Sequence, residues 1–261
     1  MPVRALAQNV VYDVMDNRGA LLGWEAVGRV DLPGGYCTGA LVASDVVLTA
    51  AHCVHDRMSG APISPEGITF RAGYHHGSEI TSRRVLRWVT PPEYETHAKT
   101  PEGMLNADAI STDVALLKLD SPVSSAEADP FRLLERAADG SEVSVASYGQ
   151  GRDQVLSREA DCNVRTRYSG GIYGFDCTVT FGSSGAPVFS REDGRMRILS
   201  VISSVSNSGE SFGPDITAQV PELSRRLNRE NARPVAGTGA RRITVGGSGD
   251  RGSIGARFVK P

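Results

Sequence analysis

Short runs of strand-forming residues recur along most of the chain, and each run is bounded by glycine, proline, asparagine or aspartate. Runs of this kind indicate many antiparallel strands in an all-β barrel or sandwich. Sustained helical periodicity is scarce. It is clearest near the end of the chain, where Pro221 stands in a first-turn position and basic residues follow before Asn228. The predicted strands are 25–30, 38–43, 46–49, 68–72, 82–90, 114–119, 142–147, 186–190 and 197–205.

Length, composition and net charge limit the classes of protein to which the chain could belong. A chain of 261 residues fits one large all-β unit or two modest domains. With 40% hydrophobic residues, 22% charged residues and a net charge of -2, nothing global points to nucleic acid or a membrane surface. No stretch approaches the roughly 18 apolar residues of a membrane helix, so we expect no membrane span.

The two ends of the chain differ from the rest. Residues 1–9 include Arg4 and small residues that suit signal cleavage, but no apolar segment precedes them, so a leader remnant and no signal at all both fit. Residues 225–261 carry a net charge of +7 and become rich in glycine and arginine. We predict a flexible, solvated basic tail over 231–261, although 242–245 and 257–259 also fit two strands that pack on a partner.

The four cysteines fall into two local pairs, Cys37 with Cys53 and Cys162 with Cys177. Neither pair has the spacing of a zinc or redox site. If each pair closes a loop of about 15 residues, it is worth about 3 kcal/mol in the chain-entropy model. Two such links suit an oxidising compartment, and the alternative is four reduced, buried thiols.

Three residues have the types that catalysis by a hydroxyl requires, namely a nucleophile, a base and an acid that orients the base. His52 follows strand-forming residues in VLTAAHCVHD, Asp113 opens the alternating segment DVALLKL, and Ser184 lies on the tight turn FGSSGAPVF. Gly182 and Gly185 permit backbone torsions closed to other residues, so N–H groups can converge beside the Ser184 hydroxyl. Such donors stabilise a developing oxyanion.

The order of these motifs resembles the chymotrypsin/trypsin-like serine proteases, most of all their secreted bacterial members. LTAAHC, DVALLKL and GSSGAP carry the resemblance, and CTGALV, PPEY, VISS and PDITAQV add lesser marks. It extends from Trp24 to Leu227, which is most of the chain. The LTAAHC motif with its earlier cysteine is specific, the serine motif less so, and DVALL alone is weak.

The resemblance implies an all-β fold of two six-stranded antiparallel Greek-key β-barrels, with a C-terminal helix and the tail. The first barrel, over 10–125, would carry His52 as general base and Asp113 as its orienting partner. The second, over 126–230, would carry Ser184 as nucleophile, with the final helix. The backbone N–H groups of Gly182 and Ser184 would form the oxyanion hole. Cys37–Cys53 matches a family disulfide, whereas Cys162–Cys177 matches no equally certain one.

Two residues depart from the family pattern. Ser183 stands where animal members carry an aspartate that pairs with a new N-terminal amine after zymogen cleavage, and the sequence has no Ile/Val-Val-Gly-Gly start to supply that amine. We therefore expect no activation of this kind and a loop held by local hydrogen bonds. Ala186 replaces the usual second glycine, and this is a small change that the following Pro187 makes tolerable.

The sequence indicates the residues of the primary specificity pocket less clearly than the catalytic candidates. The resemblance implies that Thr178, six positions before Ser184, lies at the base of this pocket, with Ser203, Ser204 and Val205 along one wall and Asp215 at another lining position. A buried, unpaired Asp215 would favour substrate Arg or Lys, while a surface-loop aspartate is the alternative.

The sequence thus predicts a secreted or periplasmic serine endopeptidase that acts on protein or peptide substrates as a monomer, with no cofactor. The remaining histidines, which have no partner at metal-ligand spacing, predict no metal site. They are His55, His75, His76 and His97. The rival hypothesis is an inactive homologue that uses the same fold as a secreted binding module. Ser183 and Ala186 keep this rival open, because a collapsed oxyanion loop abolishes turnover without touching the three catalytic candidates.

Overall fold

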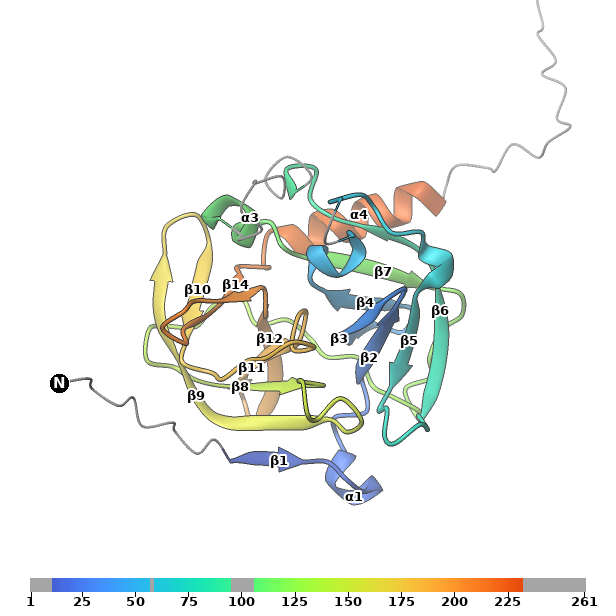
Figure 1. Cartoon of the computed structure of the whole chain (residues 1–261), viewed down its shortest axis with the longest axis horizontal. Helices are drawn as coiled ribbons and strands as arrows, with labels where there is room; N and C mark the ends of the chain where they lie inside the picture. The colour runs from blue at the N-terminus through green and yellow to red at the C-terminus, as the bar shows by residue number, and fades with distance from the viewer. Residues whose placement is uncertain (1–10, 57–58, 95–105, 232–261) are drawn as a thin grey trace, which may run out of the picture.

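Six strands from the first half of the chain form a closed barrel. The computed structural model describes residues 11–56, 59–94 and 106–231. Around the barrel the strand order is β2-β3-β4-β7-β6-β5, and every neighbouring pair is antiparallel. Figure 1 shows the barrel on the right of the molecule. Its strands are β2 (Val27–Leu32), β3 (Gly35–Ala43), β4 (Val46–Thr49), β5 (Thr69–Ala72), β6 (Thr81–Val89) and β7 (Ala115–Leu119).

Apolar residues on the inner face of these strands explain why they close on one another. Val30, Leu41, Val47, Phe70 and Leu117 come from five different strands, and all are fully buried in one cluster. Side chains alternate between the two faces of a strand, so a single run of sequence supplies both the core and the surface. The predicted strands 25–30, 38–43, 46–49, 68–72, 82–90 and 114–119 all overlap strands of this barrel.

The second half of the chain forms an eight-stranded sheet in the order β12-β11-β8-β9-β10-β14-β13, with β1 added beside β9. It lies on the left in Figure 1. β8 and β11 overlap the predicted strands 142–147 and 186–190, and 197–205 divides between β12 and β13. Its strands are β1 (Tyr12–Val14), β8 (Glu142–Ser147), β9 (Ser157–Tyr168), β10 (Ile172–Phe175), β11 (Pro187–Glu192), β12 (Arg195–Val201), β13 (Ser204–Val205) and β14 (Ser211–Pro214).

The all-β, chymotrypsin-like fold is confirmed, but the second unit is a curled open sheet and not a closed six-stranded barrel. Its path ends at β12 on one side and at the two-residue strand β13 on the other. A side chain joins the curled ends, since the Ser200 hydroxyl on β12 donates to the Pro214 carbonyl on β14 at 2.7 Å. The predicted boundary at 125/126 falls between β7 and β8 and stays a prediction.

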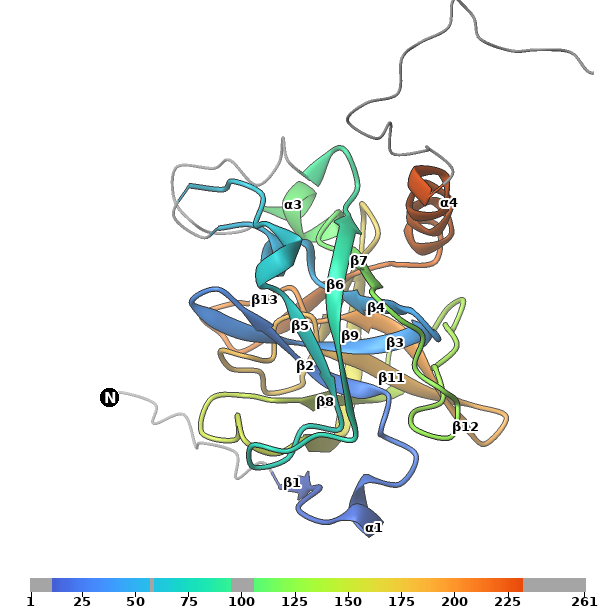
Figure 2. The ribbon, with the colours of Figure 1, turned by 90° about the vertical axis from the view of Figure 1, so that its right-hand side faces the viewer.

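One apolar cluster joins the two sheets to the C-terminal helix. Leu48 and Leu116 of the barrel and Phe189 of the open sheet share this cluster with Leu223 and Leu227. The helix α4 (Gln219–Asn231) contains the predicted segment from Pro221 to Asn228. Its two leucines are four residues apart and therefore lie on one face. Figure 2 shows α4 at the opposite end of the molecule from β1 and α1 (Arg18–Leu21).

Both predicted cysteine pairs are disulfides. Cys37–Cys53 ties β3 to the short 3₁₀ helix η1 (Ala51–Val54), and Cys162–Cys177 ties β9 to the loop after β10. Two further short helices are η2 (Pro65–Gly67) and α3 (Ala107–Ser111). Among the described helices, none has the length and apolar character needed to cross a membrane. The predicted leader remnant over 1–9, His97 and nearly all of the predicted tail lie outside the described residues.

Candidate active site

His52 and Asp113 extend from two neighbouring strands of the barrel. β4 ends where β7 begins, because Thr49 pairs with Ala115 in their antiparallel ladder. η1 follows β4 and carries His52, while Asp113 directly precedes Val114 and β7. The strand pairing therefore brings together two residues that are far apart in the sequence. His52 Nδ1 lies 2.7 Å from Asp113 Oδ2, and the His52 backbone N–H donates to Asp113 Oδ1 at 2.8 Å.

Asp113 is completely buried and has a third donor. The Ser203 hydroxyl donates to Asp113 Oδ2 at 2.5 Å, from the segment between β12 and β13. Tyr94 packs nearby, and burial together with the charge of Asp113 raises the pKa of its phenol. The PPEY motif predicts no function for Tyr94, and Ser203 is predicted to line the substrate pocket. The Ser203 side chain donates to the Asp113 carboxylate beside His52, and its place in the substrate pocket stays a prediction.

Ser184 lies on a turn that is docked against the end of β4. Gly182 and Gly185 both adopt positive φ, +88° and +73°. The Thr38 hydroxyl of β3 donates to the Gly182 carbonyl at 2.8 Å, and the Thr38 N–H donates to the Ser184 carbonyl at 2.9 Å. A Cβ on Gly185 would lie 2.8 Å from the backbone nitrogen of Ala50. The turn therefore touches the segment that leads directly into His52.

The side chains of Ser184 and His52 are not joined by a hydrogen bond in the described part of the chain. Ser184 is half-exposed, and Asp113 holds the Nδ1 side of the imidazole. A serine–histidine contact is often loose without substrate and tightens in the complex with substrate. The fold thus brings the three elements together, while the roles of the three residues stay predictions.

Local hydrogen bonds hold the turn before Ser184, as predicted for a chain with serine at position 183. Ser183 is buried, and its hydroxyl donates to the Ser147 hydroxyl at 3.1 Å. The Ser183 N–H donates to the Thr180 carbonyl at 3.0 Å, and the Thr180 N–H donates back to the Ser183 hydroxyl at 3.4 Å. This reciprocal arrangement keeps the turn compact without a charged partner. The predicted absence of amine-driven activation stays a prediction.

The residues predicted to form the specificity pocket have different surroundings. Thr178 contacts Glu159 through its N–H, and Ser204 and Val205 form the short strand β13. The premise about Asp215 is wrong, because its carboxylate is not unpaired. Asp215 Oδ2 accepts from the Arg167 guanidinium at 2.7 Å, and Oδ1 accepts from the Thr217 N–H at 3.1 Å. An ion pair already satisfies this charge, so it supplies no unmet attraction for a substrate cation.

A cavity of about 400 Å³ lies beside His52. The Cys37–Cys53 disulfide forms part of its wall, and so does Gly182 from the turn before Ser184. The rest of its lining includes the apolar side chains of Ile63 and the exposed Phe181 and the polar side chains of His55 and Asp56. None of the predicted pocket residues lines this cavity, so it is distinct from the predicted specificity pocket.

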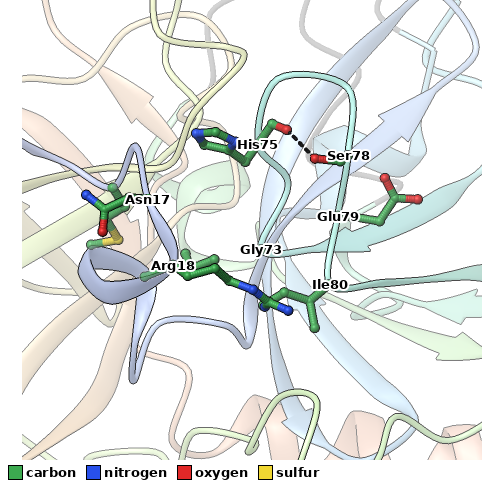
Figure 3. Close-up of a pocket in the computed structure, with 9 residues that line it drawn as sticks. Asn17, Arg18, Gly73, His75, Ser78, Glu79 and Ile80 are labelled. Carbon is green, nitrogen blue, oxygen red and sulfur yellow. Dashed lines mark hydrogen bonds between the residues drawn. The ribbon is translucent and has the colours of Figure 1, made fainter.

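A second cavity, of about 300 Å³, lies between α1 and the β5–β6 turn, and Figure 3 shows its lining. Arg18, His75 and Glu79 line it together with apolar residues, and the Ser78 hydroxyl donates to the His75 carbonyl at 2.9 Å. It includes none of the predicted catalytic residues. We therefore place the candidate active site at the first cavity and the adjacent Ser184 turn.

Comparisons with known proteins agree with this fold and with the motifs. Residues 37–197 match the family model described as "Trypsin-like peptidase domain". A protein named "Collagenase" from Hypoderma lineatum is 25% identical over 202 residues, which cover 69% of this chain and 70% of the collagenase.

Solved structures with the same fold include a Glu endopeptidase in complex with MPD and a thermostable serine protease, AL20, from an extremophilic microorganism. The Glu endopeptidase has a TM-score of 0.64 at 18% identity and covers 81% of this chain and 92% of its own. AL20 has a TM-score of 0.63 at 20% identity, and the match covers 78% of this chain and 97% of AL20. Protease Anisep from Arthrobacter nicotinovorans has a TM-score of 0.59 at 19% identity, and the match covers 77% of this chain and 94% of Anisep. The matched family domain spans more than half of the chain, and we conclude that the chain belongs to the trypsin-like peptidase family of serine proteases.

Proposed function

We propose that the protein is a serine endopeptidase in which Ser184 is the nucleophile, His52 the general base and Asp113 the residue that orients His52. The observation that carries this proposal is the short contact of 2.7 Å between His52 Nδ1 and the buried carboxylate of Asp113. Asp113 Oδ2 is an acceptor, so Nδ1 carries the imidazole proton and Nε2 has a free lone pair. That tautomer is the one that can accept a proton from a serine hydroxyl.

In the proposed reaction, Ser184 Oγ attacks the carbonyl carbon of a peptide bond while His52 Nε2 takes the hydroxyl proton. The carbonyl oxygen becomes an oxyanion, which the N–H groups of Gly182 and Ser184 bind. Collapse breaks the C–N bond, and His52 returns the proton to the leaving amine. Water then attacks the acyl-enzyme by the same route, with His52 as base, and frees Ser184. The positive φ of Gly182 supports this assignment, because it turns the backbone so that neighbouring N–H groups face the same side.

The environment we propose is an oxidising one, outside the cytoplasm in the extracellular space or the periplasm. Two disulfides and no free cysteine among the described residues support this assignment. The proposed substrate is a protein or peptide, the proposed active form is a monomer, and the chemistry needs no cofactor.

Labelling with a fluorophosphonate probe tests the proposal. The probe reacts only with an activated serine, so we expect the wild-type protein to be labelled and Ser184→Ala to show no labelling. Ser208→Ala is the matched control, because Ser208 is exposed on the turn after β13, and this variant should label like the wild type. Peptide mapping should place the adduct on Ser184. A folded wild-type protein that is not labelled would contradict the proposal and favour the binding module.

A further inference from the structure

Glu159 is a buried carboxyl group behind the loop that carries Ser184. It lies on β9, with Tyr12 of β1 beside it on one side and Val145 of β8 on the other. Only 7% of the residue is exposed. Its Oε2 accepts from the Thr178 N–H at 2.7 Å. Burying a carboxyl group raises the free energy of the folded protein unless the group makes hydrogen bonds. The bond from the Thr178 N–H offsets part of this cost for Glu159.

A second side chain binds the other polar group of Thr178. The Tyr12 hydroxyl donates to the Thr178 carbonyl at 3.4 Å. The Arg152 guanidinium stacks on the Tyr12 ring, 3.7 Å from its centre, and so fixes where that ring lies. The N–H and the C=O of Thr178 are therefore both held by side chains of the sheet beneath. We call Glu159 and Tyr12 together the Thr178 clamp.

The clamp lies at the start of the segment that shapes the Ser184 turn. Immediately before Thr178 in the sequence, Cys177 is joined by a disulfide to Cys162 on β9. Two residues after Thr178, Thr180 exchanges hydrogen bonds with Ser183, the residue next to Ser184. A shift of the Thr178 peptide therefore reaches the Ser184 N–H through a short and well-bonded stretch of chain.

We propose that Glu159 is a positioning residue for catalysis, which acts with Tyr12 through the Thr178 peptide to hold the N–H groups of the Ser184 turn in place. The inference rests on the proposed function, because that function assigns these N–H groups to the oxyanion. Glu159 itself does not touch the reacting atoms.

The surroundings of Glu159 make its charge sensitive to pH. The pKa of Glu159 is raised to about 7, first by burial and also by the charge of Asp176, while the Thr178 N–H and Arg152 oppose the shift. Tyr12 on β1, Arg152 before β9 and Asp176 after β10 are the titratable or charged groups that face it, and the neighbour on β8 is Val145. A charged carboxylate is the stronger acceptor, so its bond to Thr178 weakens as the pH falls through about 7.

The test compares Glu159→Ala with Glu159→Gln, because a glutamine oxygen can still accept the Thr178 N–H. Glu159→Ala should lower kcat on a peptide substrate about tenfold or more, since small misplacements of a catalytic group have large effects. Its Thr178 amide should also exchange hydrogen about tenfold faster, as expected when a hydrogen bond worth about 1.4 kcal/mol is lost. Glu159→Gln should restore both values to within about threefold. Asp161→Ala, an exposed carboxylate on the same strand, is the control and should match the wild type.

The pH profile of kcat adds a readout that a purely structural role would not move, because the ratio of wild-type kcat to Glu159→Gln kcat should fall as the pH drops through about 7. Exchange at the Thr178 amide, corrected for its intrinsic rate, should follow the same change. In the wild type, protection should fall as the pH drops through about 7, and Glu159→Gln should lack this change. If Glu159→Ala does not fold, Tyr12→Phe removes the other half of the clamp and should raise exchange at the same loop. Wild-type exchange and wild-type kcat in Glu159→Ala would overturn the inference, as would equal losses in Glu159→Gln. Exchange is independent of turnover, so an inactive wild type would contradict the proposed function and leave the clamp open to this test.

Discussion

Replacing Asp113 with asparagine should lower kcat for peptide hydrolysis by about 10⁴-fold while leaving the fold intact. Asp113 accepts three hydrogen bonds, two from His52 and one from Ser203. Asparagine has only one oxygen. If that oxygen accepts the His52 backbone N–H, the amide NH₂ faces Nδ1 and must donate to it. His52 then carries its proton on Nε2 and cannot accept one from Ser184.

The measurement is kcat on a peptide substrate, with the amount of folded protein determined separately by circular dichroism. Asp129→Asn makes the same chemical change at an exposed position and should leave kcat at the wild-type value. Ser203→Ala removes one donor and keeps the tautomer of His52, so its loss should be far smaller than that of Asp113→Asn. A folded Asp113→Asn variant with kcat within tenfold of the wild type would contradict the assigned role of Asp113.

The catalytic candidates could be predicted because each stands in a local motif at the end of a strand. The alternating segment after Asp113 and the glycines around Ser184 are visible in a few consecutive residues, and so is the proline that begins the last helix. The barrel follows from apolar runs that recur along the sequence. These features depend on near neighbours in the chain, and the structure bears out the strands and the helix that they indicate.

The second sheet was harder to predict, because its central strand is polar. β9 has the sequence SREADCNVRTRY and was not among the predicted strands. Several of its polar side chains find partners only after distant segments pack beside it. Arg167, for example, pairs with Asp215 across 48 positions of sequence. The same pairing explains why the expectation of an unpaired Asp215 was wrong.

The direction of a side chain was the other feature that local sequence could not supply. Ser203 and Ser204 are adjacent, and neighbouring residues in extended chain point to opposite sides. Only the completed fold shows that the Ser203 hydroxyl faces Asp113. Glu159 gave no local signal either, because its partners Tyr12 on β1 and Thr178 after β10 come from two separate segments of the chain.

Replacing Gly185 with alanine should lower the free energy of unfolding by about 3 kcal/mol, as the sum of a left-handed backbone and an overpacked site. Gly185 has a φ of +73°, which alone disfavours alanine. The added Cβ would lie 2.6 Å from the Thr38 carbonyl oxygen and 2.8 Å from the Ala50 nitrogen. Both are backbone atoms, so no side-chain rotation relieves the clash.

Gly194 provides a matched control for the backbone contribution. It has a φ of +76°, yet a Cβ there would meet nothing within 4 Å. Gly194→Ala should therefore lose only about 1 kcal/mol and keep full fluorophosphonate labelling. Urea unfolding of both variants measures the difference, and equal losses would contradict the steric argument.

The Gly185 clash should also abolish labelling of Ser184, even at temperatures where the variant stays folded. To relieve the overlap, either the Ser184 turn or the end of β4 has to move. The turn holds the proposed nucleophile, and the end of β4 leads through Ala50 to the proposed base, so each movement separates Ser184 from His52. A displacement of about 1 Å costs about 10²-fold in rate. A folded Gly185→Ala protein that labels like the wild type would show that the docking of this turn on β4 does not set the geometry of the site.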